Sequence, residues 1–287
     1  MAAETITPAV PAPSAPAIDS TVVATMRIGW LRGQLELKEF FRQREQVFFT
    51  LAFPIMLLLI FGSIFSYTID GSGGVAFARY FVPGILATGL FGVAFQTLAI
   101  QIAVERDKGV LKRLQGTPMP PAAYFVGKVI MVLALVILES VLLLAIAELL
   151  GKVSLPTDFH RWITFLWVTV LGVTAGSLFG IAYSSVPRTG KAAPAVVTSI
   201  ALVLQFLSGV YFVFTQVPQT IQQIGALFPL KWIAQGYRSV LLPDRLQSLE
   251  PAHSWEPGKT ALILGLWSVG ALIVALRTFR WRSRADS

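Results

Sequence analysis

Long stretches of apolar residues without charged side chains constrain this chain more than any other feature. Runs of about 18 or more apolar residues are long enough to cross a bilayer as helices. Only 13% of the residues are charged, against about 25% in a typical soluble protein, so the chain lacks the charge to cover a water-facing surface. We therefore expect an all-α polytopic membrane protein with six transmembrane helices, over residues 47–67, 80–104, 129–150, 162–186, 192–214 and 260–276.

The stretch that begins at the fifth expected span is unusually long. Residues 192–230, 39 positions in all, contain no charged side chain. One helix of that length would measure about 58 Å, whereas the hydrocarbon core is about 30 Å thick and two spans would need about 40 residues plus a turn. We expect one span followed by a re-entrant outer segment over 215–258, because Pro218 and Pro229 interrupt helices. Four glutamines make this segment too polar to face lipid: Gln216, Gln219, Gln222 and Gln223.

The two ends of the chain differ from the six-span domain at 47–280. Residues 1–24 are rich in alanine and proline and lack the features of a signal peptide, so we expect a disordered tail. Residues 25–46 combine apolar and basic side chains at helical spacing. This pattern is typical of an interfacial amphipathic helix, although a solvated helix flanking the first span would look similar. Residues 281–287 form a short C-terminal tail.

The distribution of charge predicts the orientation of the chain. If both termini lie on one side, that side carries 16 of the 23 lysines and arginines, which the positive-inside rule makes cytoplasmic. Of the 15 acidic residues, eight then lie inside, five outside and two, Glu139 and Glu148, within the third span. This dispersal, the absence of cysteine and the separation of His160 from His253 argue against an active site or a metal centre. The net charge of +8 suits membrane orientation better than nucleic-acid binding.

Two features inside the expected spans invite a functional interpretation. An acidic residue at a helix centre costs about 2.5–3.5 kcal/mol on insertion, so Glu139 should face protein or a water-filled path. It either contacts a substrate or serves as a proton-linked group, or it holds helices together as a protonated or hydrogen-bonded carboxyl. In the fourth span, Gly172, Gly176 and Gly180 form overlapping small-xxx-small steps, which favour close helix packing over a role in a conduit.

The loop at 105–128 is the most informative connection between spans. It combines a charged helical turn, an apolar edge at Val110, Leu111 and Leu114, and a Gly-Thr-Pro break. A short, stiff helix with an apolar edge suits docking into a groove on a partner. An ordinary charged connector would explain the same residues.

This loop resembles the cytoplasmic coupling region of type-2 ATP-binding-cassette (ABC) exporter permeases. A second similarity lies in the segments LSGVYFVFTQVP and FPLKWIAQGYR, which resemble the Ser-Gly of the fifth span and the Pro-Leu/Arg segment before the sixth. The similarity covers about 25–284, and the drug-exporter branch is the most similar. The matching residues are Glu105, Gly109, Leu111, Leu114, Thr117, Pro118, Gly127 and Lys128 in the loop, and Ser208, Gly209, Pro218, Pro229, Leu230 and Arg238 in the later segments.

The resemblance implies a permease in a bacterial inner (plasma) membrane that works as a dimer with a second copy or a paralogue. Each copy would place its coupling helix in a cleft of a separate nucleotide-binding ATPase subunit, which binds ATP and Mg. The substrate would be a drug, an antibiotic, a lipid or a glycan carrier. Glu139, Gln205 and Ser208 are the candidates for lining the translocation path, and the coupling residues are those from Glu105 to Pro118 quoted above.

The chain itself carries no ATP site. The phosphate-binding loop G-x-x-x-x-G-K-[ST] is approached only at Gly258-Lys259-Thr260, where His253 stands in place of the first glycine. We therefore expect neither enzyme activity nor a cofactor in this chain. The main alternative is a proton-coupled secondary transporter that uses Glu139, although the inverted repeats common in such proteins are not evident.

Overall fold

The computed structural model describes residues 22–65, 68 and 76–281. The described part of the chain consists of helices and connecting segments and contains no β-strand. Most of the expected N-terminal tail and residues 282–287 of the expected C-terminal tail lie outside the described residues. The tail was expected to reach residue 24, but a helix already begins at Val22.

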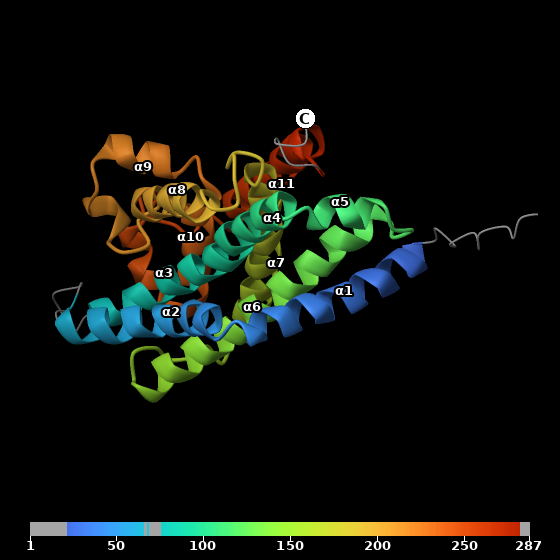
Figure 1. Ribbon diagram of the computed structural model, residues 1–287. Coiled ribbons are helices and arrows are strands. Elements are labelled where there is room, and N and C mark those ends of the chain that lie inside the picture. Colours follow the sequence, from blue (N-terminus) through green and yellow to red (C-terminus); the bar gives the residue numbers. More distant parts are fainter. Residues whose placement is uncertain (1–21, 66–67, 69–75, 282–287) are drawn as a thin grey trace, which may run out of the picture.

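The chain folds into a bundle of long helices with several short ones packed around it (Figure 1). The first half contains α1 (Val22–Arg42), α2 (Arg44–Ile64), α3 (Phe77–Phe91), the π-helical turn η1 (Gly92–Thr97), α4 (Leu98–Asp107), α5 (Val110–Gln115) and α6 (Pro121–Leu149). The second half contains α7 (Phe159–Tyr183), α8 (Ala193–Leu207), η2 (Phe214–Gln216), α9 (Gln219–Gly225), α10 (Pro229–Leu241), η3 (Asp244–Leu249) and α11 (Pro257–Thr278).

Five helical segments of the described chain are long and apolar enough to cross a membrane: α2, the continuous run from α3 through α4 (Phe77–Asp107), α6, α7 and α11. The prediction of an all-α polytopic membrane protein is therefore confirmed. The fifth expected span is shorter than predicted. Its helix, α8, has 15 residues, about 22 Å at 1.5 Å per residue, and stops at Leu207 rather than at 214 because Gly209 takes a φ of +63° and turns the chain.

The core is centred on α3, which is covered by α2, α6, α7 and α10. Three glycines of α7 lie where this helix packs closely against α3 and η1. A Cβ atom on Gly176 would lie 2.9 Å from the Cβ of Ala94, and one on Gly180 would lie 2.8 Å from the carbonyl oxygen of Phe95. A Cβ atom on Gly172 would lie 3.2 Å from the side chain of Ile233 and 3.3 Å from that of Leu90. These three positions therefore let α7 approach the α3–η1 backbone.

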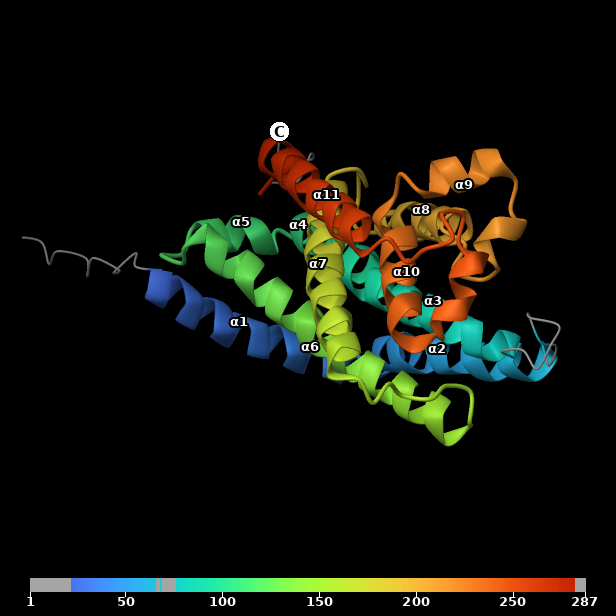
Figure 2. The ribbon, with the colours of Figure 1, turned by 180° about the vertical axis from the view of Figure 1, so that it is seen from behind.

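The N-terminal helix α1 runs alongside α6 (Figures 1 and 2). Glycines make this close approach possible, because a Cβ atom on Gly29 or Gly33 would overlap the side chain of Val126 or Ile130. The opposite side of α1 exposes apolar side chains, Trp30, Leu31, Leu35 and Phe41 among them. The helix is thus packed on the bundle along one face and presents an apolar surface along another.

The segment after α8 folds back into the bundle. Most residues of α10 are buried among α3, α7 and α11. Pro229 suits the first turn of α10, because proline has no N–H and the first N–H groups of a helix have no partner within it. In Figure 1, α8, α9 and α10 lie together at one side of the bundle.

Candidate translocation path and coupling region

A cavity of about 300 Å³ lies between α2, α3, η1, α6 and α8. Its wall combines aromatic and aliphatic side chains with a cluster of polar groups in the middle of apolar helices. Polar groups inside membrane helices usually face a path or a protein contact. The polar residues of this wall are Thr50, Thr88, Gln96, Thr97, Glu139, Thr198 and Gln205.

Glu139 supplies the carboxylate of this cavity. Its side chain is 4% exposed, and Oε2 has no hydrogen-bond partner among the described residues. Gly89 of α3 makes room for it, since a Cβ atom at that position would overlap the carboxylate. A buried carboxylate without a partner is costly, so a group that enters the cavity and donates a hydrogen bond would relieve that cost.

The other polar groups of the cavity connect neighbouring elements. Gln96 donates a hydrogen bond of 3.0 Å from Nε2 to Oγ1 of Thr198, which links η1 to α8. The hydroxyl of Tyr211 donates to Oε1 of Gln205 at 2.6 Å. Ser208 is fully buried beyond the end of α8 and is not part of the cavity wall. Glu139 and Gln205 therefore line the same cavity, whereas Ser208 does not line it.

A second cavity, of about 420 Å³, lies between the α1–α2 junction and the α4–α5 region. Its wall includes Glu36, Glu39, Glu105 and Lys108, so it is far more charged than the first cavity. The two cavities share Gln96 and Thr97. Both shared residues belong to η1, the single π-helical turn among the described residues. Such turns often occur at functional sites.

The predicted coupling helix corresponds to α5. Gly109 starts it with a φ of +70°, a conformation that favours glycine. Leu111 is fully buried in the core, whereas Leu114 is half-buried and Thr117 and Pro118 are exposed. The apolar edge expected from the sequence is therefore divided: one leucine holds α5 to the bundle, and the following residues remain at the surface.

The loop expected at 105–128 is shorter than predicted, because α6 begins at Pro121 and contains Lys128. Lys128 is fully buried and forms ion pairs with Glu36 of α1 at 2.7 Å and with Glu105 of α4 at 2.5 Å. The hydroxyl of Tyr124 donates to the second oxygen of Glu105 at 2.7 Å. The negative charges of Glu36 and Glu105 compensate the positive charge of Lys128, so that α6 can bury this lysine in the bundle.

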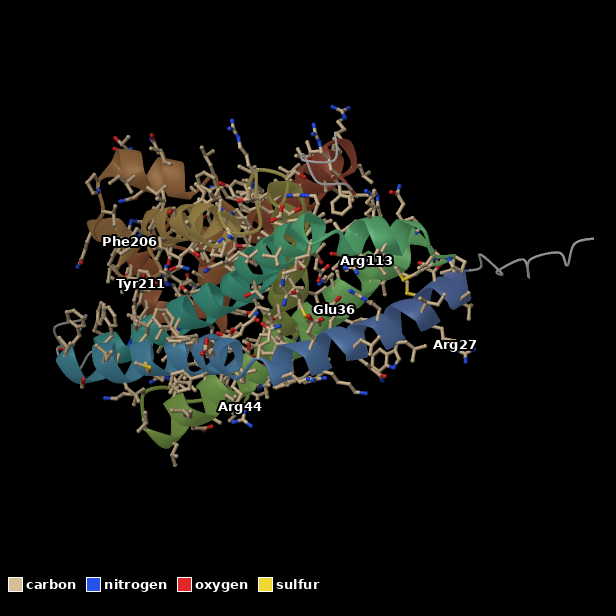
Figure 3. All side chains as sticks on the ribbon, in the orientation of Figure 1. Arg27, Glu36, Arg44, Arg113, Phe206 and Tyr211 are labelled. Atoms are coloured by element: carbon tan, nitrogen blue, oxygen red, sulfur yellow. The ribbon has the colours of Figure 1, made fainter. Side chains whose placement is uncertain are left out.

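Glu36, labelled in Figure 3, is a residue that the sequence analysis did not single out. It is 3% exposed and also pairs with Arg32 one helical turn earlier, at 2.7 Å. The four-residue spacing from Arg32 to Glu36 predicts only a surface ion pair of the kind common on helices. The contact of Glu36 with Lys128, 92 positions further along the chain, cannot be predicted from the neighbouring sequence.

A second buried charged cluster joins α10 to the segments around it. The guanidinium of Arg238 is fully buried, donates to Oε1 of Glu250 at 2.9 Å and lies over the ring of Tyr80 at 4.5 Å. It also donates to the carbonyl oxygen of Gly209 at 2.6 Å. Nearby, burial lowers the pKa of Lys231 to about 8, an effect partly offset by the negative charge of Glu250.

Comparisons with known proteins agree with this architecture. Residues 31–242 match the family described as ABC-2 type transporter. Among the similar proteins is the inner membrane transport permease YadH of Escherichia coli strain K12, 23% identical over 193 residues, or 66% of this chain and 74% of the relative. The protein of the same name in Shigella flexneri matches to the same extent.

The five helices of membrane-spanning length among the described residues identify a polytopic membrane protein. The family match covers most of the chain, and the chain belongs to the ABC-2 type transporter family. It is therefore the transmembrane subunit of an ABC transporter, a multi-pass membrane protein and not an enzyme, since this family of subunits has no ATPase site of its own.

Proposed function

We propose that this chain is the membrane subunit of an ATP-driven exporter, in which substrate moves along the two cavities described above. The observation that carries the proposal is that Gln96 and Thr97 line both cavities. The charged cavity beside Glu105 and the cavity that contains Glu139 are therefore neighbours across η1, and in the proposed path substrate passes from the first to the second. The substrate class is a drug, an antibiotic, a lipid or a glycan carrier, each of which has apolar surface to match the chamber wall.

The proposed path is closed at its far end by the segment that follows α8. Val210 packs against α3, where a Cβ atom on Gly84 would overlap the Val210 carbonyl. Arg238 holds this turn through the Gly209 carbonyl. Residues 215–258 then act as a re-entrant outer cap, and both termini face the cytoplasm of a bacterial cell with an inner membrane. The positive-inside distribution supports this orientation.

Coupling to ATP hydrolysis is assigned to α5 and the residues after it. Leu111 anchors the helix, while Leu114, Thr117 and Pro118 face a cleft on a separate nucleotide-binding subunit that binds ATP and Mg. Movement of α5 would pass to α4 and, through the Glu105–Lys128 pair, to α6 and α1. The same ion pairs would carry the motion to the walls of the entrance cavity.

A second permease copy, or a paralogue, would complete the path. The chamber opens beside α2, whose membrane-length window is only 17% buried within one chain. Exposed side chains of α2 and α8, such as Phe49, Phe53 and Leu202, lie at this opening. A partner helix there would cover apolar surface and enclose the chamber.

The experiment that tests this function measures ATP hydrolysis by a candidate ATPase subunit encoded beside this chain, co-expressed and reconstituted with the full chain. Leu114→Asp should abolish substrate-stimulated ATPase activity while the permease dimer stays intact by size-exclusion chromatography. Leu149→Asp makes the same substitution at a side chain that is 86% exposed at the far end of α6, and it should leave the activity unchanged. Full stimulation in Leu114→Asp would show that the docking assignment is wrong.

The unpartnered carboxylate of Glu139 also keeps a proton-coupled secondary transporter as a second candidate. The ATP-driven exporter and the proton-coupled transporter differ in their energy source. Uptake into inverted vesicles that requires ATP and survives a protonophore supports the exporter, whereas uptake driven by an imposed proton gradient without ATP supports the alternative.

A further inference from the structure

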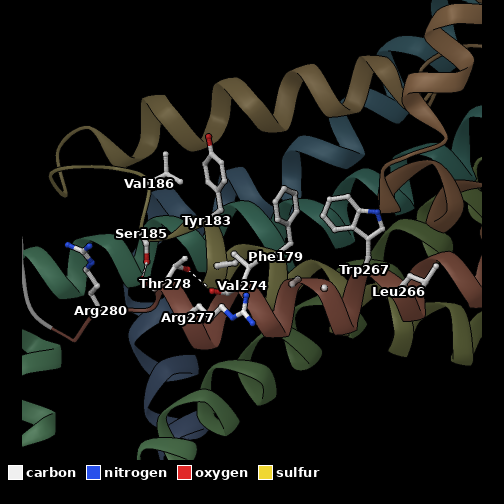
Figure 4. A pocket seen from close by; sticks show the side chains of 13 residues that line it. Phe179, Tyr183, Ser185, Val186, Leu266, Trp267, Val274, Arg277, Thr278 and Arg280 are labelled. Carbon is white, nitrogen blue, oxygen red and sulfur yellow. Dashed lines mark hydrogen bonds between the residues drawn. The ribbon is translucent and has the colours of Figure 1, made fainter.

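A groove of about 830 Å³ lies on the outside of the bundle between α7 and α11, away from the proposed path (Figure 4). Its walls are formed largely by apolar and aromatic side chains, including Phe179, Tyr183, Trp267 and Val274. The hydroxyl of Ser185 donates to the carbonyl oxygen of Thr278 at 2.9 Å, which closes the groove at the ends of the two helices. The volume is in the range of small-molecule sites.

Two arginines mark this closed end. Arg277 and Arg280 both line the groove, and both are exposed. Neither forms an ion pair with a described residue. In Figure 4 they lie toward the end that contains Ser185 and Thr278, while Trp267 lies at the opposite end. The groove is thus cationic at one end and apolar along its length.

The dimensions of the groove match one leaflet of a bilayer. Arg277 lies ten positions after Trp267 on α11, or about 15 Å further along the helix. Half of a hydrocarbon core of about 30 Å has the same depth. A lipid whose phosphate lies at Arg277 would therefore extend its acyl chain along the groove as far as Trp267, near the bilayer centre.

We propose that this groove binds one anionic phospholipid, with its phosphate held by Arg277 and Arg280 and an acyl chain lying along Phe179 and Trp267. Basic pockets between membrane helices are suited to anionic head groups, and Arg is the side chain best shaped for phosphate. A second copy of this chain is a poorer occupant. It would bring the same two arginines to a symmetric contact, so that like charges would face each other. The site is independent of the proposed transport path.

The test measures lipid binding to the purified full-length chain by native mass spectrometry. The chain is titrated with phosphatidylglycerol, with phosphatidylcholine of the same acyl chains, and with soluble glycerol 3-phosphate. The double variant Arg277→Gln/Arg280→Gln removes the charge. Gly270→Leu fills the groove, since Gly270 lines it and a Cβ atom there meets nothing within 4 Å. Gly265→Leu is the matched control, at another open α11 glycine that does not line the groove.

We expect one phosphatidylglycerol to bind in preference to phosphatidylcholine. The double arginine variant should weaken it about 25-fold, at about fivefold for each charge. Gly270→Leu should weaken it severalfold, because the leucine side chain takes the space in which the acyl chain packs. Gly265→Leu should bind like the wild type. Equal binding of the two lipids, equal binding by Gly270→Leu and Gly265→Leu, or competition by glycerol 3-phosphate alone as strong as by the lipid would each overturn the proposal. So would a change of oligomeric state in Gly270→Leu without loss of lipid.

Discussion

Arg238 on α10 donates a hydrogen bond of 2.6 Å to the carbonyl oxygen of Gly209, 29 residues earlier in the chain. The two residues belong to the two later segments through which the sequence resembles type-2 ABC permeases. Gly209 ends α8 in a left-handed turn, and Arg238 binds the carbonyl that this turn exposes. The segments are thus two halves of one structural unit, held together by a buried charge that also pairs with Glu250.

Replacing Arg238 should therefore destabilise the whole chain. Arg238→Gln leaves the buried Glu250 carboxylate with Lys231, 3.9 Å away, as its remaining cation among the described residues. Breaking a buried ion pair typically costs about 3–5 kcal/mol, and the remaining pair places this variant toward the lower end. Thermal unfolding in detergent should show a large fall in the melting temperature, whereas Arg245→Gln, at an exposed position of η3, should show almost none. The double variant Arg238→Gln/Glu250→Gln should lose less than the sum of the single variants. If Arg238→Gln unfolds like the wild type, the cluster does not support the fold.

Glu139→Gln should change transport while the protein remains folded. The substitution keeps the shape of the side chain in the cavity but removes its ability to ionise or to exchange a proton in the proposed path. We expect a several-fold change in transport rate or a shift in the range of substrates, measured in proteoliposomes with the ATPase subunit. Glu148→Gln is the control, since it lies nine residues further along α6 and is exposed. A variant that is less stable but transports normally would assign Glu139 to helix packing alone.

Loss of the Lys128 charge should loosen α1 from the bundle. Lys128→Met leaves Glu36 and Glu105 facing each other without their shared cation. The chain contains no cysteine, so single cysteines report accessibility without background. A cysteine at Leu37, which packs against the core, should react about tenfold faster with a maleimide in Lys128→Met, given the cost of unpaired buried carboxylates. A cysteine at Leu35, 58% exposed on the same helix, should react equally in both backgrounds.

The two glycine-to-alanine variants Gly180→Ala and Gly265→Ala should have opposite effects on stability. The Gly180 Cβ would lie 2.8 Å from the Phe95 carbonyl oxygen, so we expect a loss of about 1–3 kcal/mol from overpacking. A Cβ at Gly265 meets nothing within 4 Å, so the better helix propensity of alanine should add about 0.5–1 kcal/mol. Thermal unfolding of the two variants side by side checks both signs. Equal effects would mean that the α7 contact is not tight.

Local pattern was sufficient to predict the class of this protein. The charge-free runs predicted α2, α3 through α4, α6, α7 and α11, because a helix in lipid must satisfy its own backbone hydrogen bonds and cover itself with apolar side chains. Both conditions are properties of a single segment and can be recognised without knowing its neighbours. The charged turn with an apolar edge at Val110, Leu111 and Leu114 likewise predicted α5 from local pattern alone.

Tertiary structure decided what the individual residues of those segments contact. It alone placed Leu111 in the core, joined Lys128 to Glu36 and Glu105, and ended α8 at the turn that Arg238 holds. These outcomes depend on side chains far apart in the sequence, which meet only when the helices pack. Hydrophobic periodicity can be read from neighbouring positions in the chain, so the sequence by itself determined the helices. Ion pairs and close packing depend on side chains that lie within a few ångströms of each other in space, so only the packed bundle decided which residues form the site.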